Sequence, residues 1–278
     1  MTKNLEPTIG IVAISKNEEV DMPHFLRHIV DWVDEIVIVD DGSTDSTKEI
    51  VLSFGTKVKL VEQKMDMQKG GFAEQRNRGI REATSDWLLH MDIDERITPS
   101  FARELKTAVQ DTRFNAYRYR RLNFFLNRSM KGGGLQDWNN PQLARRGFHR
   151  FENSVHETCI VDGKPMRIGQ LNNKMWHLND ESYLERMNKS MVYSQNQAIR
   201  LAKNGQRIKW HHLLLIPFLE FIYKFFWKAG FRDGAVGLLW SLHTSSAMFR
   251  ACSLVWDEQN RLSRAAIEGK VVEEIESG

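Results

Sequence analysis

"LLHMDIDERI", residues 88–97, is an apolar run that ends on two carboxylates separated by a single residue. The apolar residues are typical of a buried strand, and residues two apart on a strand face the same side. Asp92 and Asp94 therefore bring two negative charges to one side of the strand end. These charges repel each other unless a metal, an arginine or water lies between them. The stretch predicts a buried strand with a charged site at its carboxyl end.

The segments around this strand alternate between strand and helix patterns. The expected strands are 8–15, 35–40, 57–63 and 86–94. The expected helices are 18–33, a segment capped by Ser43 and Thr44 that runs to about Phe54, the helical part of a turn and helix at 70–85, and one opened by Pro99. Strand–helix alternation of this kind predicts an α/β fold, with a mostly parallel sheet flanked by helices.

Polar side chains follow three of these strands. Ligands of open α/β sheets bind beyond the carboxyl ends of the strands, so these side chains are candidate site residues. They are Ser15, Asn17 and Glu18 after the first strand, Asp40 and Asp41 after the second, and Asp92 and Asp94 after the fourth. The alternative is that they are ordinary loop and cap residues. The sequence contains neither G-x-G-x-x-G after the first strand nor a P-loop, which argues against a dinucleotide fold and a P-loop nucleotidase.

The composition indicates a folded protein and argues against nucleic-acid binding and a disulfide framework. A chain of 278 residues with 41% hydrophobic and 27% charged residues reads as folded, and a net charge of +3 gives no support for nucleic-acid binding. Cys159 and Cys252 are too few for a disulfide framework and are expected to be buried thiols. The first ten residues lack the apolar core of a signal peptide, which predicts a cytoplasmic location.

Four motifs occur together and in order. They are "VAISKNEE", "DEIVIVDDGSTDST", "AEQRNRGIREATSDWLLHMDIDE" and "SVHE". In this combination the chain resembles family 2 glycosyltransferases of the GT-A fold, most of all the subgroup of lipopolysaccharide-core β-1,4-glucosyltransferases. The resemblance covers about residues 8–180 well and is looser beyond. It implies a GT-A catalytic domain at 1–180 and a helical extension at 181–278.

The resemblance also implies a metal ion and a nucleotide-sugar donor. Mn²⁺ or Mg²⁺ beside Asp94 would neutralise the diphosphate of a UDP-sugar as it leaves. Asp92 is expected to face ribose or sugar while remaining a candidate ligand, and His177 is a candidate third ligand. Packing beside Trp176 is the alternative for His177.

Further contacts are implied residue by residue. The Ala13–Glu18 loop lines the nucleotide pocket, Asp40 or Asp41 contacts base or ribose, and Arg76 and Asn77 meet the diphosphate or donor sugar. A solvated helix face is the alternative for the last two. Glu157 is the expected catalytic base of an inverting transfer, with Asp137, Glu152 and Asp162 as substitutes. His156 is expected to orient that base or touch the donor, and Asp137 and Trp138 to contact the sugar.

The rest of the chain is expected to support this site. A strand at 115–126 carries Arg118, Arg120 and Arg121, which a solvated face explains more simply than a nucleic-acid patch. Contact with a phosphate-bearing acceptor is the third possibility for these arginines. Residues 131–147 are rich in glycine, asparagine and proline and predict a loop over the sugar site. Residues 208–232 mix aromatic, apolar and basic residues, which predicts an in-plane or re-entrant helix pair on the cytoplasmic leaflet. Packing on the catalytic domain or on a second subunit of a homo-oligomer is the alternative.

The function expected from these features is an inverting, metal-dependent glycosyltransferase. It would move a hexose, glucose from UDP-glucose, to an envelope glycan or lipid-linked acceptor, working as a peripheral protein on the inner face of the cell membrane. A nucleotidyltransferase with the same carboxylate–metal site is one rival, although "AISKNEE" lacks the glycine that such enzymes use. A non-catalytic, membrane-bound sugar-nucleotide binding protein is the other rival.

Overall fold

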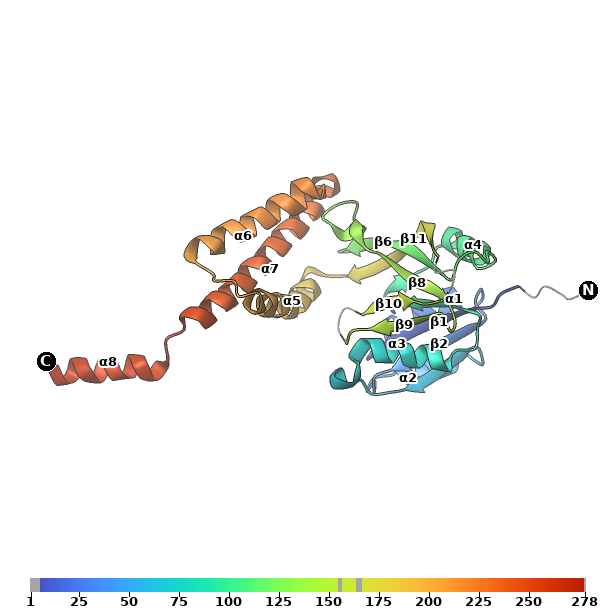
Figure 1. The fold of residues 1–278 in the computed structure, drawn as a ribbon, viewed down its shortest axis with the longest axis horizontal. Helices are drawn as coiled ribbons and strands as arrows, with labels where there is room; N and C mark the ends of the chain where they lie inside the picture. Colours follow the sequence, from blue (N-terminus) through green and yellow to red (C-terminus); the bar gives the residue numbers. More distant parts are fainter. Residues whose placement is uncertain (1–5, 155–156, 164–166, 278) are drawn as a thin grey trace, which may run out of the picture. The chain divides into compact units, whose positions relative to one another are not determined.

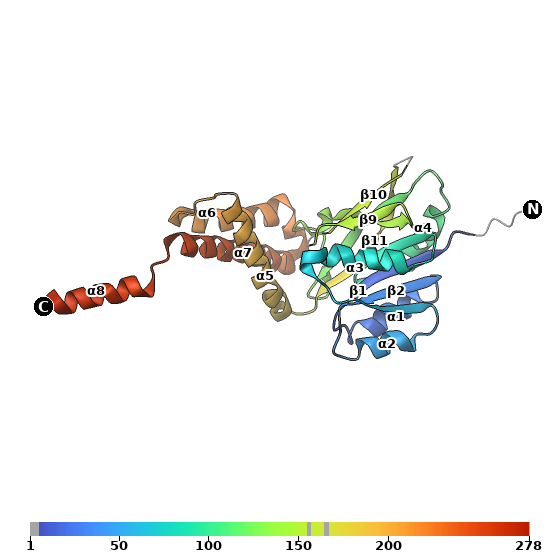
Figure 2. The same cartoon turned by 60° about the horizontal axis from the view of Figure 1, so that its bottom comes forward.

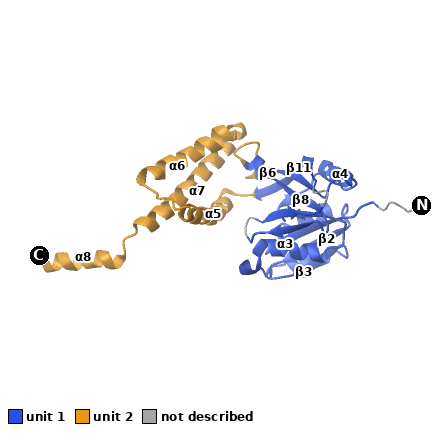
Figure 3. Ribbon diagram, viewed as in Figure 1, with its two compact units in different colours: residues 1–124, 135–179 blue, residues 125–134, 180–278 orange. Residues whose placement is uncertain are grey.

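The structure is a computed structural model that describes residues 6–154, 157–163 and 167–277. The chain divides into two compact units (Figure 3). The first unit comprises residues 1–124 and 135–179, and the second comprises 125–134 and 180–278. Each unit is described by itself below.

The first unit is built on a sheet whose first half is parallel (Figure 1). Its strands β1 (Ile9–Ser15), β2 (Glu35–Asp40), β3 (Val58–Glu62) and β4 (Trp87–Met91) lie in the order β3-β2-β1-β4. The connecting helices are α1 (Met22–Ile29), α2 (Thr47–Ser53), the short η1 (Met67–Lys69), α3 (Gly71–Glu82) and α4 (Pro99–Ala108). The predicted α/β fold with a parallel sheet flanked by helices is confirmed.

The sheet continues beyond β4 with antiparallel pairing. The order is β4-β8-β6-β11-β5, with β8 (Asn139–Arg145), β6 (Ala116–Phe125), β11 (Ile168–Asp180) and β5 (Glu95–Arg96); η2 (Leu135–Asp137) precedes β8. The prediction of one loop over residues 131–147 is therefore wrong for the β8 segment. Its Asn and Pro residues discouraged a strand assignment, but pairing with β4 and β6 on both sides outweighs that local preference.

The two faces of the parallel strands bury different residues. Ile11, Ile36 and Ile38 belong to the core cluster that contains the apolar faces of α1 and α4. Val12, Val37 and Val39 belong to a second cluster with Ile80 and Ala83, at and just beyond the end of α3. This alternation follows from the two-residue period of a strand and explains why the strands read as continuous apolar runs. Helices thus cover both faces of the parallel half.

A separate hairpin lies against α3 (Figure 2). Its strands are β9 (His149–Glu152) and β10 (Thr158–Val161). The backbone N–H of Phe72 donates to the carbonyl of Ser154 at 3.1 Å. Gly71 has φ +52°, and a Cβ at this position would lie 2.5 Å from that same carbonyl oxygen. Glycine at the start of α3 therefore permits the close approach of helix and hairpin.

The carboxyl ends of the parallel strands lie at one edge of the sheet, as predicted. Ser15 lies opposite Asp40, and Ala13 lies opposite Met91, the last residue of β4. The predicted fourth strand extends three residues too far at its carboxyl end, because Asp92–Asp94 form the turn between β4 and β5. Their proximity thus comes from a turn and not from the strand period.

The predicted cap of the second helix is also wrong. The helix α2 begins at Thr47, and neither Ser43 nor Thr44 caps it. The Ser43 N–H and hydroxyl are instead bonded to Asp40. Short polar side chains compete for nearby backbone and side-chain groups in turns, which moves the helix start along the chain.

The second unit is helical in the part of the chain that the structure describes, apart from β7 (Arg128–Ser129) at its start. Its elements are α5 (Tyr183–Lys203), α6 (Trp210–Ile222), the π-helical turn η3 (Tyr223–Trp227), η4 (Gly230–Asp233), α7 (Gly234–Asn260) and α8 (Arg264–Ser277). A small core of Ala198, Ile208, Ala251, Cys252 and Val255 joins α5 to α7. No helix in the described residues is both long and apolar enough to cross a membrane.

Candidate active site

Three predicted metal ligands meet beyond the end of β4. Asp92 and Asp94 come from the β4–β5 turn, and His177 comes from β11, the partner of β5. One potential ligand atom from each residue lies within 4.8 Å of the others. His177 lies inside the long strand β11, opposite Glu95 of β5. The antiparallel β5–β11 pairing therefore assembles the cluster.

Asp94 and His177 form the part of the cluster that suits a metal best. The Nε2 atom of His177 lies 3.2 Å from Oδ2 of Asp94. The Nδ1–H donates to Oδ1 of Asn123 at 2.7 Å, and the amide of Asn123 is oriented by its own bond to the carbonyl of Leu135. Because Nδ1 is occupied by this hydrogen bond, Nε2 is the nitrogen that can bind a cation.

Burial lowers the pKa of His177, but the hydrogen bond to Asp94 and the charge of Asp94 outweigh burial, so the pKa is raised overall. A metal bound at Nε2 must displace this proton. Metal affinity is therefore expected to fall as the pH is lowered through the pKa of His177.

Two arginines lie beside the carboxylate of Asp92. The Nη2 atoms of Arg76 and Arg121 lie 2.6 and 2.7 Å from its two carboxylate oxygens. Desolvation opposes the charged form of Asp92, but the charges of Arg76 and Arg121 hold its pKa well below the ordinary value. Asp92 is thus a carboxylate clamped between two guanidinium groups, and Asp94 is the more available metal ligand.

Arg76 also holds Glu157, the predicted base. Its Nε donates to Oε1 of Glu157 at 2.9 Å, while its Nη1 is buried and has no hydrogen-bond partner among the described residues. On the other side, the Nε of Arg121 donates to the buried Glu95 at 2.6 Å. Acidic and guanidinium groups therefore alternate from Glu157 to Glu95. Together with Asp94, these groups make four carboxylates against two arginines, which favours a bound cation at this edge.

Both residues of the second predicted acidic pair are buried, but they have different partners. Asp40 is fully buried and accepts hydrogen bonds from the hydroxyl of Ser15 at 3.1 Å and from the N–H of Ser43 at 2.8 Å. Asp41 is 8% exposed, pairs with Lys16 at 2.8 Å and accepts from the N–H of Met65. Of the two, Asp41 is better placed to meet a nucleotide.

The loop after β1 is held by the loop after β2. Asn17 has φ +56°, its N–H donates to the hydroxyl of Ser43, and its Oδ1 accepts from the N–H of Thr44. The N–H of Glu18 donates to the hydroxyl of Thr47. The side chain of Ala13 is wholly buried in the core. Asn17 and Glu18 therefore shape the edge of the site through loop–loop hydrogen bonds.

The remaining predicted residues lie in different surroundings. Glu152 and Asp162 both pair with Arg150, and each is about half exposed. Asp137 is exposed, while the ring of Trp138 lies 4.1 Å below the guanidinium carbon of Arg121. His156 lies outside the described residues.

Three residues of the site were missed by sequence reasoning. Arg121 was expected on a solvated face, and that prediction is wrong for this arginine, although Arg118 and Arg120 are exposed. The missed signal is the two-residue period of β6, which puts Arg121 on the same side as the buried Tyr117 and Tyr119. Glu95 and Asn123 gave no local signal, because their partners come from distant strands.

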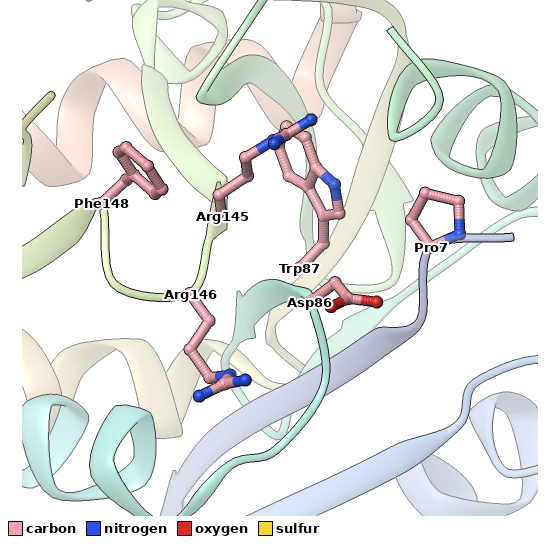
Figure 4. A pocket seen from close by; sticks show the side chains of 6 residues that line it. All are labelled: Pro7, Asp86, Trp87, Arg145, Arg146 and Phe148. Carbon is pink, nitrogen blue, oxygen red and sulfur yellow. The ribbon is translucent and has the colours of Figure 1, made fainter. Parts of the chain in front are cut away.

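A cavity of about 280 Å³ lies at the opposite end of β4 (Figure 4). It is lined by Pro7, Asp86, Trp87, Arg145, Arg146 and Phe148. Arg145 lies along the ring of Trp87, with its guanidinium carbon 5.2 Å from the ring centroid. None of the predicted catalytic, nucleotide or metal residues lines it, so this cavity is separate from the candidate active site.

The donor set fits a hard divalent cation. Oxygens of Asp94 and Asp92 with an imidazole nitrogen suit Mn²⁺, and Mg²⁺ accepts the oxygens. Two neighbouring ligands of an octahedral ion with bonds of about 2.1 Å lie about 3 Å apart, which matches the 3.2 Å between Asp94 and His177.

A family model described as glycosyl transferase family 2 matches residues 10–160, which is more than half of the chain. The chain belongs to glycosyl transferase family 2. The α/β sheet and its acidic turn at the carboxyl edge are accordingly those of a GT-A glycosyltransferase. The resemblance carried by the four sequence motifs is confirmed.

Relatives of similar length share this assignment. An uncharacterized glycosyltransferase of Rickettsia conorii is 26% identical over 260 residues, covering 90% of each chain. The lipopolysaccharide core biosynthesis glycosyltransferase LpsC of Rhizobium meliloti is 26% identical over 236 residues, covering 79% of this chain and 84% of its own. Among solved structures, residues 1–349 of Staphylococcus aureus TarS in complex with UDP-GlcNAc align with a TM-score of 0.48 at 14% identity, covering 91% of each chain.

Asn77 was expected at the donor, but its amide binds the hairpin that carries Glu157. Its Nδ2 donates to the carbonyl of Phe151 at 2.9 Å, and its Oδ1 accepts from the N–H of Phe151 at 2.8 Å. Asn77→Ala leaves both buried backbone groups unsatisfied. We expect the free energy of unfolding to fall by about 2 kcal/mol in urea denaturation. Arg81→Ala on the same helix, which removes an exposed ion pair with Glu74, is the control and should cost less than about 1 kcal/mol.

Proposed function

We propose that this family 2 member is an inverting, metal-dependent hexosyltransferase. The donor is UDP-glucose, and the acceptor is a cell-envelope glycan or glycolipid at the inner face of the cell membrane. The observation that carries the proposal is the convergence of Asp92, Asp94 and His177 at the carboxyl edge of the sheet, beside an arginine with a buried N–H group that no described residue pairs.

Asp94 and His177 would hold Mn²⁺ or Mg²⁺, with Asp92 facing the same space. When bound, the cation supplies charge neutralisation for the diphosphate that leaves the sugar. The hydrogen bond from His177 to Asn123 keeps the imidazole in the orientation that presents Nε2. The two arginines on Asp92 keep its carboxylate ionised and fixed in place.

Arg76 is suited to bind the donor diphosphate. Its Nη1 is buried without a partner in the described part of the chain, while its other donors hold Asp92 and Glu157. A buried unpaired N–H of a guanidinium group is costly unless an anion meets it. A phosphate oxygen of the donor satisfies this group and brings the donor between the metal ligands and Glu157.

Glu157 would act as the base. Its Oε1 is held by Arg76, and among the residues that the structure describes none bonds Oε2. That oxygen is free to accept the proton of the acceptor hydroxyl as the hydroxyl attacks the anomeric carbon. The bond to the diphosphate breaks on the opposite side of the sugar, which inverts its configuration.

At the far end of the donor, Asp41 would contact the base or ribose. It is largely buried, and its charge is balanced by Lys16. Desolvation opposes ionisation, but the hydrogen bond from Lys16 outweighs it and lowers the pKa of Asp41. Asp41 therefore remains an acceptor for hydroxyl or imide N–H groups at neutral pH.

The relationship to LpsC supports an envelope acceptor. The second unit also suits a membrane surface, because α6 exposes leucine and aromatic side chains. Trp210, Leu214, Phe218 and Trp227 are each more than half exposed. Lys209 lies just before α6, and Lys224 and Lys228 lie within and just after η3. Basic residues at such positions are typical of helices that rest among lipid headgroups.

Release of UDP tests the function. The purified protein with Mn²⁺ or Mg²⁺, UDP-glucose and a membrane extract as acceptor is expected to release UDP, and removal of the metal with EDTA should stop it. A parallel screen with other UDP- and GDP-sugars measures donor choice. Release of pyrophosphate from nucleoside triphosphates, or tight donor binding with no transfer to any acceptor, would contradict the proposal.

Vesicle sedimentation tests the membrane contact. We expect the protein to bind vesicles that contain anionic lipids, and Phe218→Ser with Trp227→Ser to weaken binding at least about tenfold, because each aromatic ring buries apolar surface in the headgroup zone. Leu52→Ser, at an exposed leucine of α2, is the matched control. Equal binding by the double variant and the control would exclude α6 and η3 as the membrane face.

A further inference from the structure

A cavity of about 300 Å³ lies in the second unit, between α5 and α7. Its walls carry Arg186 and Arg200, the hydroxyls of Ser190 and Ser194, and an apolar side formed by Trp240 and Met248. None of its lining residues is acidic. This combination of cationic, hydroxyl and apolar groups differs from the cavity of Figure 4, where Asp86 offsets the arginines.

Arg250 lies behind one wall and brings a charge that no carboxylate balances. Its three guanidinium nitrogens donate to the hydroxyls of Ser190 at 2.6 Å, Ser246 at 2.9 Å and Ser194 at 3.2 Å. Within the described residues it has no acidic partner. Hydroxyl groups satisfy its hydrogen bonds and leave its positive charge in place, so the cavity wall remains attractive to an anion.

The two arginines that line the cavity keep unused donors. Arg186 is 8% exposed, and its guanidinium lies over the rings of Tyr193 and Trp240 at 5.5 and 5.4 Å. Its Nη1 is 3.2 Å from Asp180, but its Nε is buried with no hydrogen-bond partner among the described residues. Arg200 is exposed and makes no ion pair with any described residue. A buried, unpaired N–H beside an open cavity favours a bound acceptor atom.

The pKa of His243 reflects its burial and the positive charge of the nearby arginines. It lines the same cavity and lies 5.5 Å from the ring of Tyr183. Burial, and then the charges of Arg186 and Arg250, lower its pKa to about 4. The imidazole is therefore neutral at physiological pH, and the arginines are the source of positive charge at the cavity.

We propose that this cavity binds a phosphate group carried by an amphipathic molecule, with Arg186, Arg200 and the Ser190 hydroxyl on the phosphate and Trp240 and Met248 against its apolar part. Arginine forks match phosphate oxygens, and such charge-assisted bonds are stronger than neutral ones. Resting on the proposed function, the ligand is the phosphorylated part of the lipid-linked acceptor. The same chemistry is found in a phospholipid headgroup and in a soluble phosphate ester.

Calorimetric titration of the full chain with inorganic pyrophosphate, in EDTA and with excess UDP so that the proposed donor site is already occupied, tests the site. We expect Arg250→Gln and Arg200→Gln each to weaken binding about tenfold, since a hydrogen bond to a charged group is worth roughly 1.5–3 kcal/mol. Lys203→Gln removes the same charge from an exposed position of α5 outside the cavity and should change binding less than about twofold. Arg200 is exposed, and its side chain makes no ion pair or hydrogen bond with any described residue, so Arg200→Gln keeps the test valid if Arg250→Gln is unstable.

Unchanged affinity in both arginine variants, or an equal loss in Lys203→Gln, overturns the proposal. Binding to phosphatidylcholine vesicles with and without phosphatidic acid then shows whether the phosphate group belongs to a lipid headgroup or to a soluble phosphate ester. Loss of the phosphatidic-acid preference in Arg250→Gln indicates a lipid headgroup, and loss of pyrophosphate binding alone indicates a soluble phosphate ester. Because neither measurement requires UDP release, failure of the transferase assay and failure of this site are distinguishable.

Discussion

Asp94→Asn is expected to lower metal-dependent UDP release by at least about 1,000-fold. Asp94 is the carboxylate of the cluster that arginine does not occupy, and it lies 3.2 Å from the ligand nitrogen of His177. Its loss removes the anionic ligand that completes the site, and a bound cation contributes several kcal/mol of charge stabilisation to the leaving diphosphate. The measurement is steady-state UDP release at saturating metal, together with Mn²⁺ affinity by calorimetry.

Asp31→Asn is the matched control, because Asp31 is an exposed aspartate of the same unit that lies outside the cluster and makes no ion pair with any described residue. It should retain both UDP release and Mn²⁺ affinity. Full turnover by Asp94→Asn would refute the metal role of this residue. Weaker Mn²⁺ binding with unchanged turnover would separate the metal site from the chemistry.

Glu157→Gln is expected to lower kcat by about 100- to 10,000-fold while the affinity for UDP-glucose stays within about threefold. Glutamine keeps the shape of the side chain and an oxygen that can accept from Arg76 Nε, so the contact at 2.9 Å is preserved. It cannot take a proton from the acceptor hydroxyl. Single-turnover transfer and donor titration by calorimetry measure the two effects separately.

Glu152→Gln makes the same change on the same hairpin, at a half-exposed carboxylate that pairs with Arg150. Its kcat should remain within about twofold of the original. The reverse result, with Glu152→Gln inactive and Glu157→Gln active, would move the base to the residue that the sequence ranked as a substitute. Loss of donor affinity in Glu157→Gln would instead assign Glu157 to binding.

Local patterns were sufficient for much of the first unit. The apolar runs and their polar ends predicted β1, β2 and the carboxyl edge of the sheet, because strand burial and strand termination depend on residues close in sequence. The β8 segment was missed because its Asn and Pro residues resemble a loop until neighbours on both sides supply pairing.

Local sequence patterns were not sufficient to predict how the side chains of the site are arranged. The sequence brought Asp92 and Asp94 together and left open whether metal, arginine or water separates them. The structure assigns two arginines to Asp92, from positions 16 and 29 residues away, and joins Arg76 to Glu157 across 81 residues. The residue pattern of a single helix or strand contains no information about these ion pairs between distant segments.

By itself, the sequence determined that this chain is an α/β family 2 glycosyltransferase with acidic residues at one sheet edge. That information lies in strand and helix periods and in short motifs, which are properties of neighbouring residues. Only the tertiary structure decided that Asp92 is held by guanidinium groups and that Asp94 lies against His177. Strand order and antiparallel pairing set those distances, because they bring together side chains that are far apart along the chain.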